Sequence, residues 1–300
     1  MSGKNSFGFI GCGNMGGALA KAVCKGVDPL DVYLSNRSRE KTEALRQSII
    51  EESKALGKGE AAGGCCLKEC PASEGSGMPF ASEGPVISDN LSIAGKCKFI
   101  FLGVKPQGLS ALLEEIRPVL MERADEFVLI SMAAGTTIEK IKSFAGDFPV
   151  IRIMPNLPAA VGKGVVLYDS MGVSEDDLGA FLSAMKAAGE LVPVEEGKID
   201  AASAISGCGP AFVFMFIESL ADGAVKCGIP RKTALKLAMA TVSGSAEYAA
   251  ASESHPEELK DAVCSPGGTT IEGVLALEAG AFRATVADAV VSAYEANKKF

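Results

Sequence analysis

The chain has 300 residues, of which 48% are hydrophobic and 22% charged, so it can bury a substantial core in one large domain or two smaller ones. Its formal net charge of -8 argues against a nucleic-acid partner, because phosphate backbones are bound by clustered lysine and arginine. The longest apolar run, 211–217, is far shorter than the roughly 20 residues that cross a bilayer. We therefore expect no membrane segment and, since no N-terminal signal is recognisable, a cytoplasmic protein.

The nine cysteines are scattered and odd in number, which favours reduced thiols that pack as small hydrophobes. Only Cys65, Cys66 and Cys70 cluster, and the single histidine, His255, is poorly placed in the sequence to complete a zinc site. We expect no bound metal.

Residues 7–20, FGFIGCGNMGGALA, give a short strand, a glycine turn and a small-residue helix, the order that a dinucleotide pyrophosphate requires. Gly11 allows the sharp turn, Gly13 leaves no Cβ between backbone and phosphate, and Gly16 lets helix and strand approach closely. The alternative is a glycine-rich turn used only for packing.

A second strand at 32–35 ends in Asn36, Arg37 and Ser38, where enzymes that prefer NAD carry an acidic residue for the ribose hydroxyl. Arg37 can bind a 2'-phosphate through its planar fork, with Asn36 and Ser38 donating further hydrogen bonds. NADPH is therefore the expected cofactor, and NADH remains possible. The alternative is that Arg37 is a solvated turn residue.

A helix is expected at 39–56, and the composition then changes. Residues 57–85 are rich in Gly, Ser, Glu and Pro and cannot bury enough apolar surface to offset their ordering entropy. We interpret them as a mobile insertion.

Strands expected at 98–102, 127–131 and 150–154 are of the apolar kind that is buried in a parallel sheet, and ligands bind outside the carboxyl ends of such strands. The turns after them should therefore face the cofactor. After the third strand, Pro155 and Pro158 fix an extended loop that leaves the Asn156 amide free to bind. Two closing strands, 165–168 and 191–194, flank a helix at 176–188.

From Lys198 onward the strand signal disappears, and helices are expected at 209–227, 231–252, 256–263, 271–278 and 282–299. The first of them is apolar nearly all round, as expected in the centre of a bundle or at a subunit interface. We expect this domain to complete its core with a second copy of itself.

Residues 265–270, SPGGTT, form a second candidate anion site, because a flexible glycine pair and three hydroxyl residues precede a helix N-terminus. An ordinary Ser/Thr helix cap is an equally open interpretation.

Together these motifs resemble those of pyrroline-5-carboxylate reductases, the NAD(P)H-dependent enzymes of the last step of proline synthesis. The matching segments are FIGCGNMG at 9–16, NRS at 36–38, VKPQ at 104–107, RIMPNLP at 152–158, SGCGPA at 206–211, HPEELKD at 255–261 and SPGGTT at 265–270. The resemblance covers nearly the whole chain outside 57–85. Cys208, Phe212 and Thr269 depart from the residues usual in the family, and Thr269 is the one expected to alter the fit of the substrate.

The resemblance implies a Rossmann-type doubly wound α/β domain, 1–196, followed by an all-helical substrate and dimerisation domain, 197–300. The family's helical domains interlock in a homodimer, often assembled further into rings such as decamers. By position, Gly11, Gly13, Asn14, Met15 and Gly16 would lie at the pyrophosphate, Asn36, Arg37 and Ser38 at the ribose phosphate, Val104, Lys105 and Pro106 on the cofactor, and Ala133, Ala134, Gly135 and Asn156 near the nicotinamide.

For the substrate, the resemblance implies that Ser265, Gly267, Gly268 and Thr269 hold its carboxylate, that Thr270 bonds the ring nitrogen and that Glu196 lies nearby. Ser265 and Thr270 are the candidate catalytic residues. A cyclic imine protonated on nitrogen is already electrophilic at carbon, so hydride transfer requires orientation and one hydrogen bond rather than a His or Lys base.

Two other functions are compatible with this plan. One is another imine reductase or a β-hydroxyacid dehydrogenase; the latter uses a lysine of the helical domain, and the long apolar helix offers only Lys226, near its end. The other is a non-catalytic dinucleotide-binding sensor, which would have no need of the 265–270 turn.

Overall fold

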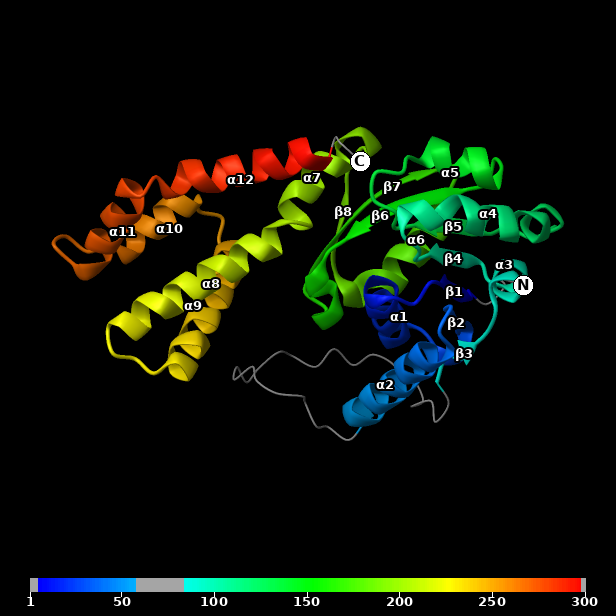
Figure 1. The fold of residues 1–300 in the computed structure, drawn as a ribbon, viewed down its shortest axis with the longest axis horizontal. Helices are drawn as coiled ribbons and strands as arrows, with labels where there is room; N and C mark the ends of the chain where they lie inside the picture. The colour runs from blue at the N-terminus through cyan, green and yellow to red at the C-terminus, as the bar shows by residue number, and fades with distance from the viewer. Residues whose placement is uncertain (1–4, 58–83, 298–300) are drawn as a thin grey trace. The chain divides into compact units, whose positions relative to one another are not determined.

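The computed structural model describes residues 5–57 and 84–297. The chain divides into two compact units, Met1–Gly207 and Cys208–Phe300 (Figure 1). Most of the insertion expected at 57–85, including Cys65, Cys66 and Cys70, lies outside the described residues.

In the first unit, eight strands of the described residues form one sheet in the order β3-β2-β1-β4-β5-β6-β7-β8. Their bounds are β1 (Phe7–Ile10), β2 (Val32–Ser35), β3 (Val86–Ile87), β4 (Phe99–Leu102), β5 (Val128–Ser131), β6 (Val150–Pro155), β7 (Gly164–Met171) and β8 (Gly189–Pro193). All neighbouring strands run parallel except β6 and β7, which are antiparallel. The strand order reverses at β1, as in a doubly wound dinucleotide-binding sheet, which confirms the predicted fold class.

Successive residues of the central strands point to opposite faces of the sheet, and each face has its own apolar core. Phe7 and Phe9 of β1 stack on Phe99 and Phe101 of β4 on one face, against α1 and α6. On the other face Ile100 packs with the apolar residues of α3, α4 and α5. The central strands are thus buried on both sides, which explains why they read as continuous apolar runs.

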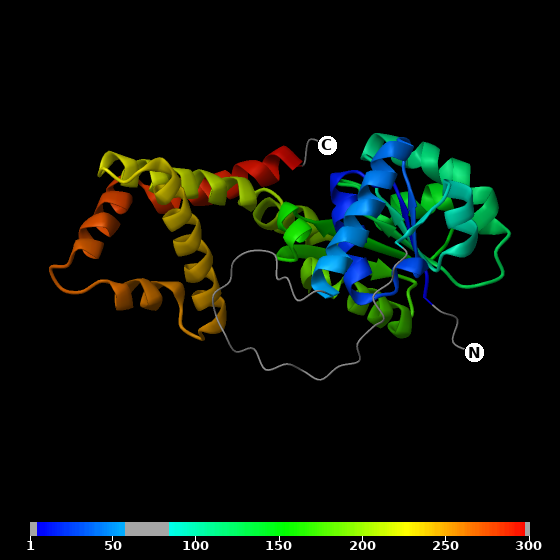
Figure 2. The same ribbon diagram turned by 90° about the horizontal axis from the view of Figure 1, so that it is seen from below.

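The helices of this unit lie on both faces of the sheet, with α1 and α2 (blue) on one side and α3 to α5 (cyan to green) on the other (Figure 2). Their bounds are α1 (Asn14–Gly26), α2 (Arg39–Gly57), α3 (Asn90–Lys96), α4 (Pro106–Met121), α5 (Ile138–Ala145), α6 (Glu175–Met185) and α7 (Glu196–Ser206), with 3-10 turns η1 (Pro29–Asp31), η2 (Leu157–Val161) and η3 (Lys186–Ala188). The extended loop expected after β6 is wrong, because η2 begins directly after Asn156.

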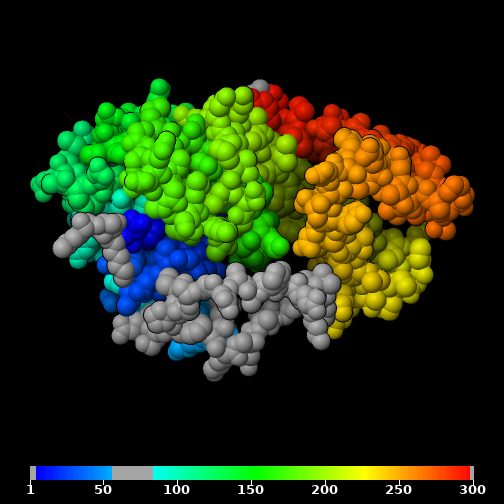
Figure 3. All heavy atoms as spheres, turned by 180° about the vertical axis from the view of Figure 1, so that it is seen from behind, coloured from blue at the N-terminus to red at the C-terminus, as the bar shows by residue number. Residues whose placement is uncertain are grey.

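The second unit is helical throughout its described residues, with α8 (Gly209–Lys226), α9 (Arg231–Ala251), α10 (Pro256–Val263), α11 (Thr269–Ala279) and α12 (Phe282–Asn297). The buried residues of its described core are three alanines, Ala221, Ala234 and Ala238, against which Ile217, Ala224, Val225 and Leu235 pack partly buried. Large apolar side chains lie instead on its surface, which is yellow to red in Figure 3: Val213, Phe214, Met215, Leu220, Leu237, Met239, Tyr248, Leu275, Leu277, Phe282, Val286 and Val291 are each at least 38% exposed. A surface this apolar is characteristic of a protein interface.

One helical stretch of the described residues, Glu196–Lys226, is long and apolar enough to cross a membrane, and 11% of its most apolar window is buried. Length and composition alone are weak evidence for a span. An interface helix has the same composition, and the exposed residues of α8 belong to the apolar surface described above.

Candidate functional site

The strand register brings the predicted cofactor residues to one edge of the sheet. Ile10 of β1 is level with Ser35 of β2 and with Leu102 of β4, and Leu102 is level with Ser131 of β5. The turns that follow these four strands therefore emerge side by side: they carry Gly11 to Gly16, Asn36 to Ser38, Val104 to Pro106, and Ala133 to Gly135. Residues as far apart in the sequence as Gly11 and Gly135 therefore lie along one edge of the sheet, beside the strand reversal where this class of sheet binds its ligands.

The turn after β1 is closed by backbone contacts that only glycine permits. Gly11 has φ +95, and a Cβ added there would lie 2.6 Å from the carbonyl oxygen of Gly103. A Cβ at Gly16 would lie 2.4 Å from the carbonyl oxygen of Gly11, and one at Gly103 would lie 2.3 Å from the same oxygen. The roles predicted for Gly11 and Gly16 agree with this geometry. Gly103, which the motif did not single out, completes the junction.

The N-terminus of α1 is available to an anion. Gly13 is the N-cap and provides no side chain to the first N–H groups of the helix. Gly13 and Asn14 are exposed, and a Cβ at Gly13 would find no protein atom within 4 Å. The unpaired N–H groups and the partial positive charge of the helix end fit a pyrophosphate.

The thiol of Cys12 lies within this turn and stays neutral. It is buried, and its Sγ donates to the carbonyl oxygen of Phe9 at 3.6 Å. Burial raises the pKa of the Cys12 thiol to about 12, against a smaller opposite effect of a hydrogen bond from the Ser35 backbone. At neutral pH the side chain therefore places no negative charge near bound phosphates.

The turn after β2 is braced by Asn36. Its Oδ1 accepts the backbone N–H of Arg37 at 3.0 Å, and its Nδ2 donates to the Cys12 carbonyl oxygen at 3.4 Å, which joins the two turns. The Ser38 hydroxyl accepts the Lys41 N–H at 3.4 Å. Arg37 is exposed and makes no ion pair within the described residues, so its guanidinium is available to a phosphate.

The turns after β4 and β5 offer mostly backbone groups to a ligand. Lys105 is the exposed N-cap of α4, with Pro106 at the first helical position. Ala133 is buried, whereas Ala134 and Gly135 are exposed, and Gly135 has φ +64. Within the 132–137 turn, Ala134, Gly135 and Thr137 are exposed, and the absence of bulk at Ala134 and Gly135 leaves room for a flat ring.

Asn156 differs from the prediction. Its side chain is 6% exposed, its Nδ2 donates to the Ser206 carbonyl oxygen at 2.8 Å, and its Oδ1 accepts the Val165 N–H at 2.9 Å. The expectation of a free amide is wrong, because both ends of the amide bond to the chain itself. Asn156 fastens the end of α7 to the start of β7.

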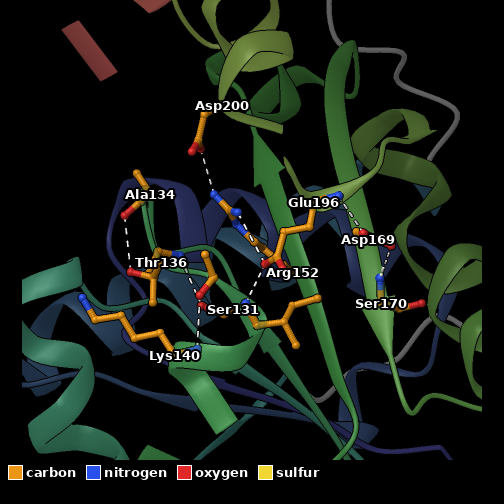
Figure 4. A network of polar contacts seen from close by, with 12 residues as sticks. Ser131, Ala134, Thr136, Lys140, Arg152, Asp169, Ser170, Glu196 and Asp200 are labelled. Carbon is orange, nitrogen blue, oxygen red and sulfur yellow. Dashed lines mark hydrogen bonds and ion pairs between the residues drawn. The ribbon is translucent and has the colours of Figure 1, made fainter. Parts of the chain in front are cut away.

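Arg152 lies at the centre of a polar network that the sequence did not reveal (Figure 4). Its guanidinium is buried among carboxylates, with Nη2 2.8 Å from Asp200 Oδ1 and Nη1 3.5 Å from Glu196 Oε1. The available signals were one arginine in the apolar strand 150–154 and two carboxylates one helical turn apart. Glu196, predicted to lie near the substrate, has its carboxylate bonded to its own domain.

In the second unit, the 265–270 turn leads into α11. Gly267 has φ +66, Gly268 donates its N–H to the Ser265 carbonyl oxygen at 3.0 Å, and the helix begins at Thr269. Ser265, Thr269 and Thr270 are exposed, and Gly268 provides no side-chain cap. The turn therefore offers hydroxyls and unpaired backbone N–H groups together, the donors that a carboxylate accepts.

The helices on either side of this turn are tied together at the surface. Arg283 of α12 pairs with Glu257 of α10 and, at 2.6 Å, with Glu278 of α11. His255 caps α10 through its Nδ1, which accepts the Glu257 N–H at 3.2 Å. His255 therefore has a structural role, as the cap of α10.

No group of three or more potential metal-ligating side chains occurs within residues 5–57 and 84–297. The predicted positions thus gather as two separate donor sets, a dinucleotide-binding edge in the first unit and an anion-binding turn in the second.

Two family models match the chain, and each covers one of these two donor sets. Residues 196–300 match the family model described as pyrroline-5-carboxylate reductase dimerisation. Residues 6–135 match the one described as NADP oxidoreductase, coenzyme F420-dependent.

Relatives that align over nearly the whole of this chain are pyrroline-5-carboxylate reductases. A pyrroline-5-carboxylate reductase of Escherichia coli is 35% identical over 300 residues, covering 99% of this chain and 98% of its own. One of Pisum sativum is 33% identical over 301 residues, covering 100% and 97%. Among solved structures, the Plasmodium falciparum pyrroline carboxylate reductase with NADP bound has a TM-score of 0.76 at 29% identity, covering 99% and 98%. That of Coxiella burnetii has a TM-score of 0.80 at 28% identity, covering 98% of each chain.

Proposed function

The chain belongs to the pyrroline-5-carboxylate reductase family, and from this premise we propose that it reduces 1-pyrroline-5-carboxylate to L-proline with NADPH. It is an NAD(P)H-dependent oxidoreductase that acts on a C=N bond. The observation that carries the substrate assignment is the exposed 265–270 turn, whose hydroxyls and helix N-terminus suit a small carboxylate.

The proposed chemistry requires orientation more than proton transfer. A bound nicotinamide dinucleotide supplies the hydride. On the chain's side, the turn holds the substrate carboxylate through Ser265, Gly267, Gly268 and Thr269, and the Thr270 hydroxyl accepts the N–H of the protonated ring nitrogen. Together these contacts fix the imine carbon for attack, and no titrating base of the protein is needed.

We assign the cofactor to the edge of the first unit's sheet. The pyrophosphate would lie on Gly11 to Gly16, with Val104 to Pro106 beside it, and the nicotinamide at Ala133 to Gly135. Asn156 would lie near the nicotinamide without bonding to it through its side chain, because its amide is bonded to Ser206 and Val165. The fit is supported by the open N-terminus of α1 and by the exposed Ala134 and Gly135.

Arg37 supports NADPH as the preferred form over NADH. Replacing Arg37 with alanine should raise the KM for NADPH about 10-fold, equal to about 1.4 kcal/mol of binding, because the 2'-phosphate loses its cation. The KM for NADH should stay within about 2-fold. Steady-state kinetics with both cofactors measures this, and Arg39→Ala, two residues further along the same surface, is the matched control. An equal rise in KM for NADPH and NADH would show that Arg37 does not bind the 2'-phosphate.

Oligomerisation occurs through the helical domain, whose match to the dimerisation family covers 196–300. We propose a homodimer that assembles further into a decamer. The exposed apolar residues of α8, α9, α11 and α12 supply the interface. Light scattering after size exclusion should give ten times the chain's 30.8 kDa, and a mass of twice that value would limit the assembly to the dimer.

Two further assignments complete the proposal. The dinucleotide-binding domain is taken as 1–196 and the substrate and dimerisation domain as 197–300. The enzyme is placed in the cytoplasm, which fractionation of cells expressing the tagged chain would test.

One assay separates the competing functions: NADPH oxidation followed by absorbance with 1-pyrroline-5-carboxylate, with hydroxyacid and ketoacid substrates, and with cofactor alone. Turnover of the cyclic imine supports the proposal. Activity on a ketoacid alone would favour the hydroxyacid dehydrogenase alternative, and binding without turnover would favour a sensor.

A further inference from the structure

Arg152 is a buried cation that pairs with Glu196 and Asp200 of α7 (Figure 4). Arg152 is 2% exposed and sits on β6 level with Ser131, the last residue of β5. Its Nη2 lies 2.8 Å from Asp200 and its Nη1 3.5 Å from Glu196, both on α7. A buried cation left without such partners is strongly destabilising, so the guanidinium holds the two carboxylates in place.

The Glu196 carboxylate has a second partner on a different element. Its Oε1 accepts the backbone N–H of Ile138 at 2.6 Å. Ile138 is the first residue of α5, so its N–H has no carbonyl partner within the helix. The hydroxyl of the N-cap, Thr137, accepts a different N–H, that of Lys140, at 3.2 Å. A carboxylate at this helix end also interacts favourably with the positive end of the helix dipole.

Glu196 is fixed at its backbone as well. Its N–H donates to Asp169 Oδ2 at 2.7 Å, and Asp169 is the residue directly opposite Arg152 on β7. Both ends of Glu196 are therefore tied to β6 and β7, which are rigid parts of the sheet. The Ile138 N–H is in this way connected to the core of the domain.

The segment that this connection restrains is the 132–137 turn. At its start, the Ala133 N–H donates to the Ser131 hydroxyl at 3.3 Å. Within it, the Thr136 hydroxyl donates to the Ala134 carbonyl oxygen at 3.4 Å. At the end of the turn, the Ile138 N–H donates to the Glu196 carboxylate. Between these bonds lie the exposed Ala134 and Gly135, which we assign to the nicotinamide, and the exposed N-cap Thr137.

We propose that Glu196, held by Arg152, is a positioning residue that sets the 132–137 turn against the nicotinamide half of the cofactor, rather than a substrate contact. This rests on the proposed function, since that function places the nicotinamide at the turn. The expected consequence is selective. Affinity for the nicotinamide half depends on Glu196, and affinity for the adenosine half does not, because Asn36 to Ser38 lie in the turn after β2, outside the network.

Calorimetric titration with two probes tests this. NADPH carries both halves, whereas 2',5'-ADP carries only the adenosine half with its phosphate. Glu196→Ala removes the acceptor and should weaken NADPH binding about 10-fold while changing 2',5'-ADP binding less than 2-fold. Glu196→Gln keeps an acceptor oxygen but loses the charge, and should weaken NADPH binding about 3-fold with 2',5'-ADP again unchanged. Glu195→Ala is the matched control, because Glu195 adjoins Glu196 but is exposed and pairs only with Lys198 in this region.

The outcomes are distinct. Equal losses for both probes, or an unchanged ratio in the folded Glu196→Gln variant, would overturn the positioning role and leave a merely structural one. A raised KM for 1-pyrroline-5-carboxylate with unchanged NADPH affinity would instead make Glu196 a substrate contact. If the wild-type protein binds neither probe, the proposed function itself fails. Glu196→Gln carries the test if Glu196→Ala does not fold.

Discussion

Thr270→Ala should lower kcat/KM for 1-pyrroline-5-carboxylate by about 10- to 100-fold, which corresponds to about 1.4 to 2.7 kcal/mol of transition-state stabilisation. The variant loses the one oriented hydrogen bond proposed at the reacting nitrogen. The fold should be unaffected, because Thr270 is exposed in the first turn of α11 and alanine is the better helix former. Steady-state kinetics at saturating NADPH measures the loss.

Two further variants make this result specific. Thr270→Ser restores the hydroxyl and should recover most of the activity. Thr285→Ala is the control, because Thr285 is exposed on α12 and its hydroxyl bonds, among the described residues, only to the carbonyl oxygen of Ala281, the residue directly before the helix. Unchanged kinetics in Thr270→Ala would remove Thr270 from the site.

Gly16→Ala should lower both stability and cofactor affinity. Its Cβ would lie 2.4 Å from the carbonyl oxygen of Gly11, a backbone atom that has no rotamer with which to move aside. Overpacking of this kind costs about 1–3 kcal/mol. For a domain of this size that corresponds to a Tm lower by about 2–12 °C. NADPH affinity should fall by at least about 10-fold, because the turn must open to admit the methyl group.

Gly13→Ala is the matched comparison. A Cβ there meets no protein atom within 4 Å, so the Tm should stay within about 1 °C while NADPH affinity falls by a similar factor. Thermal unfolding and NADPH titration separate the two variants. Full affinity in Gly13→Ala would mean that the pyrophosphate does not lie on this turn.

Local patterns in the sequence were enough to predict seven of the eight strands, the helices of the second unit and the two glycine turns, whereas β3, α3 and α4 were not predicted. Apolar runs fix the strands because both faces of a parallel sheet are buried, and the glycines at 11 and 16 mark positions where backbone approaches backbone. The helix predicted at 271–278 begins two residues earlier, at Thr269, which brings Thr269 and Thr270 into the first turn.

Contacts between distant segments could not be predicted in the same way. The Asn156 amide is occupied by Ser206, 50 residues away, and by Val165, so its occupancy depends on the packing of α7 against the sheet. Arg152 similarly finds Asp200 at a separation of 48 residues. The antiparallel course of β7 is also invisible in its composition, since an apolar strand has the same sequence in either direction.

The three-alanine core of the second unit has a thermodynamic consequence. Three alanines, with the partly buried Ile217, Ala224, Val225 and Leu235 packed against them, provide only a small part of the apolar burial that holds a domain of this size together. We therefore expect association to supply much of the driving force for folding. Folding and assembly of these helices are then coupled, so a higher protein concentration favours the folded, associated state by mass action. The melting temperature of the helical domain should rise with concentration, and dilution should unfold its substrate turn before the dinucleotide-binding sheet.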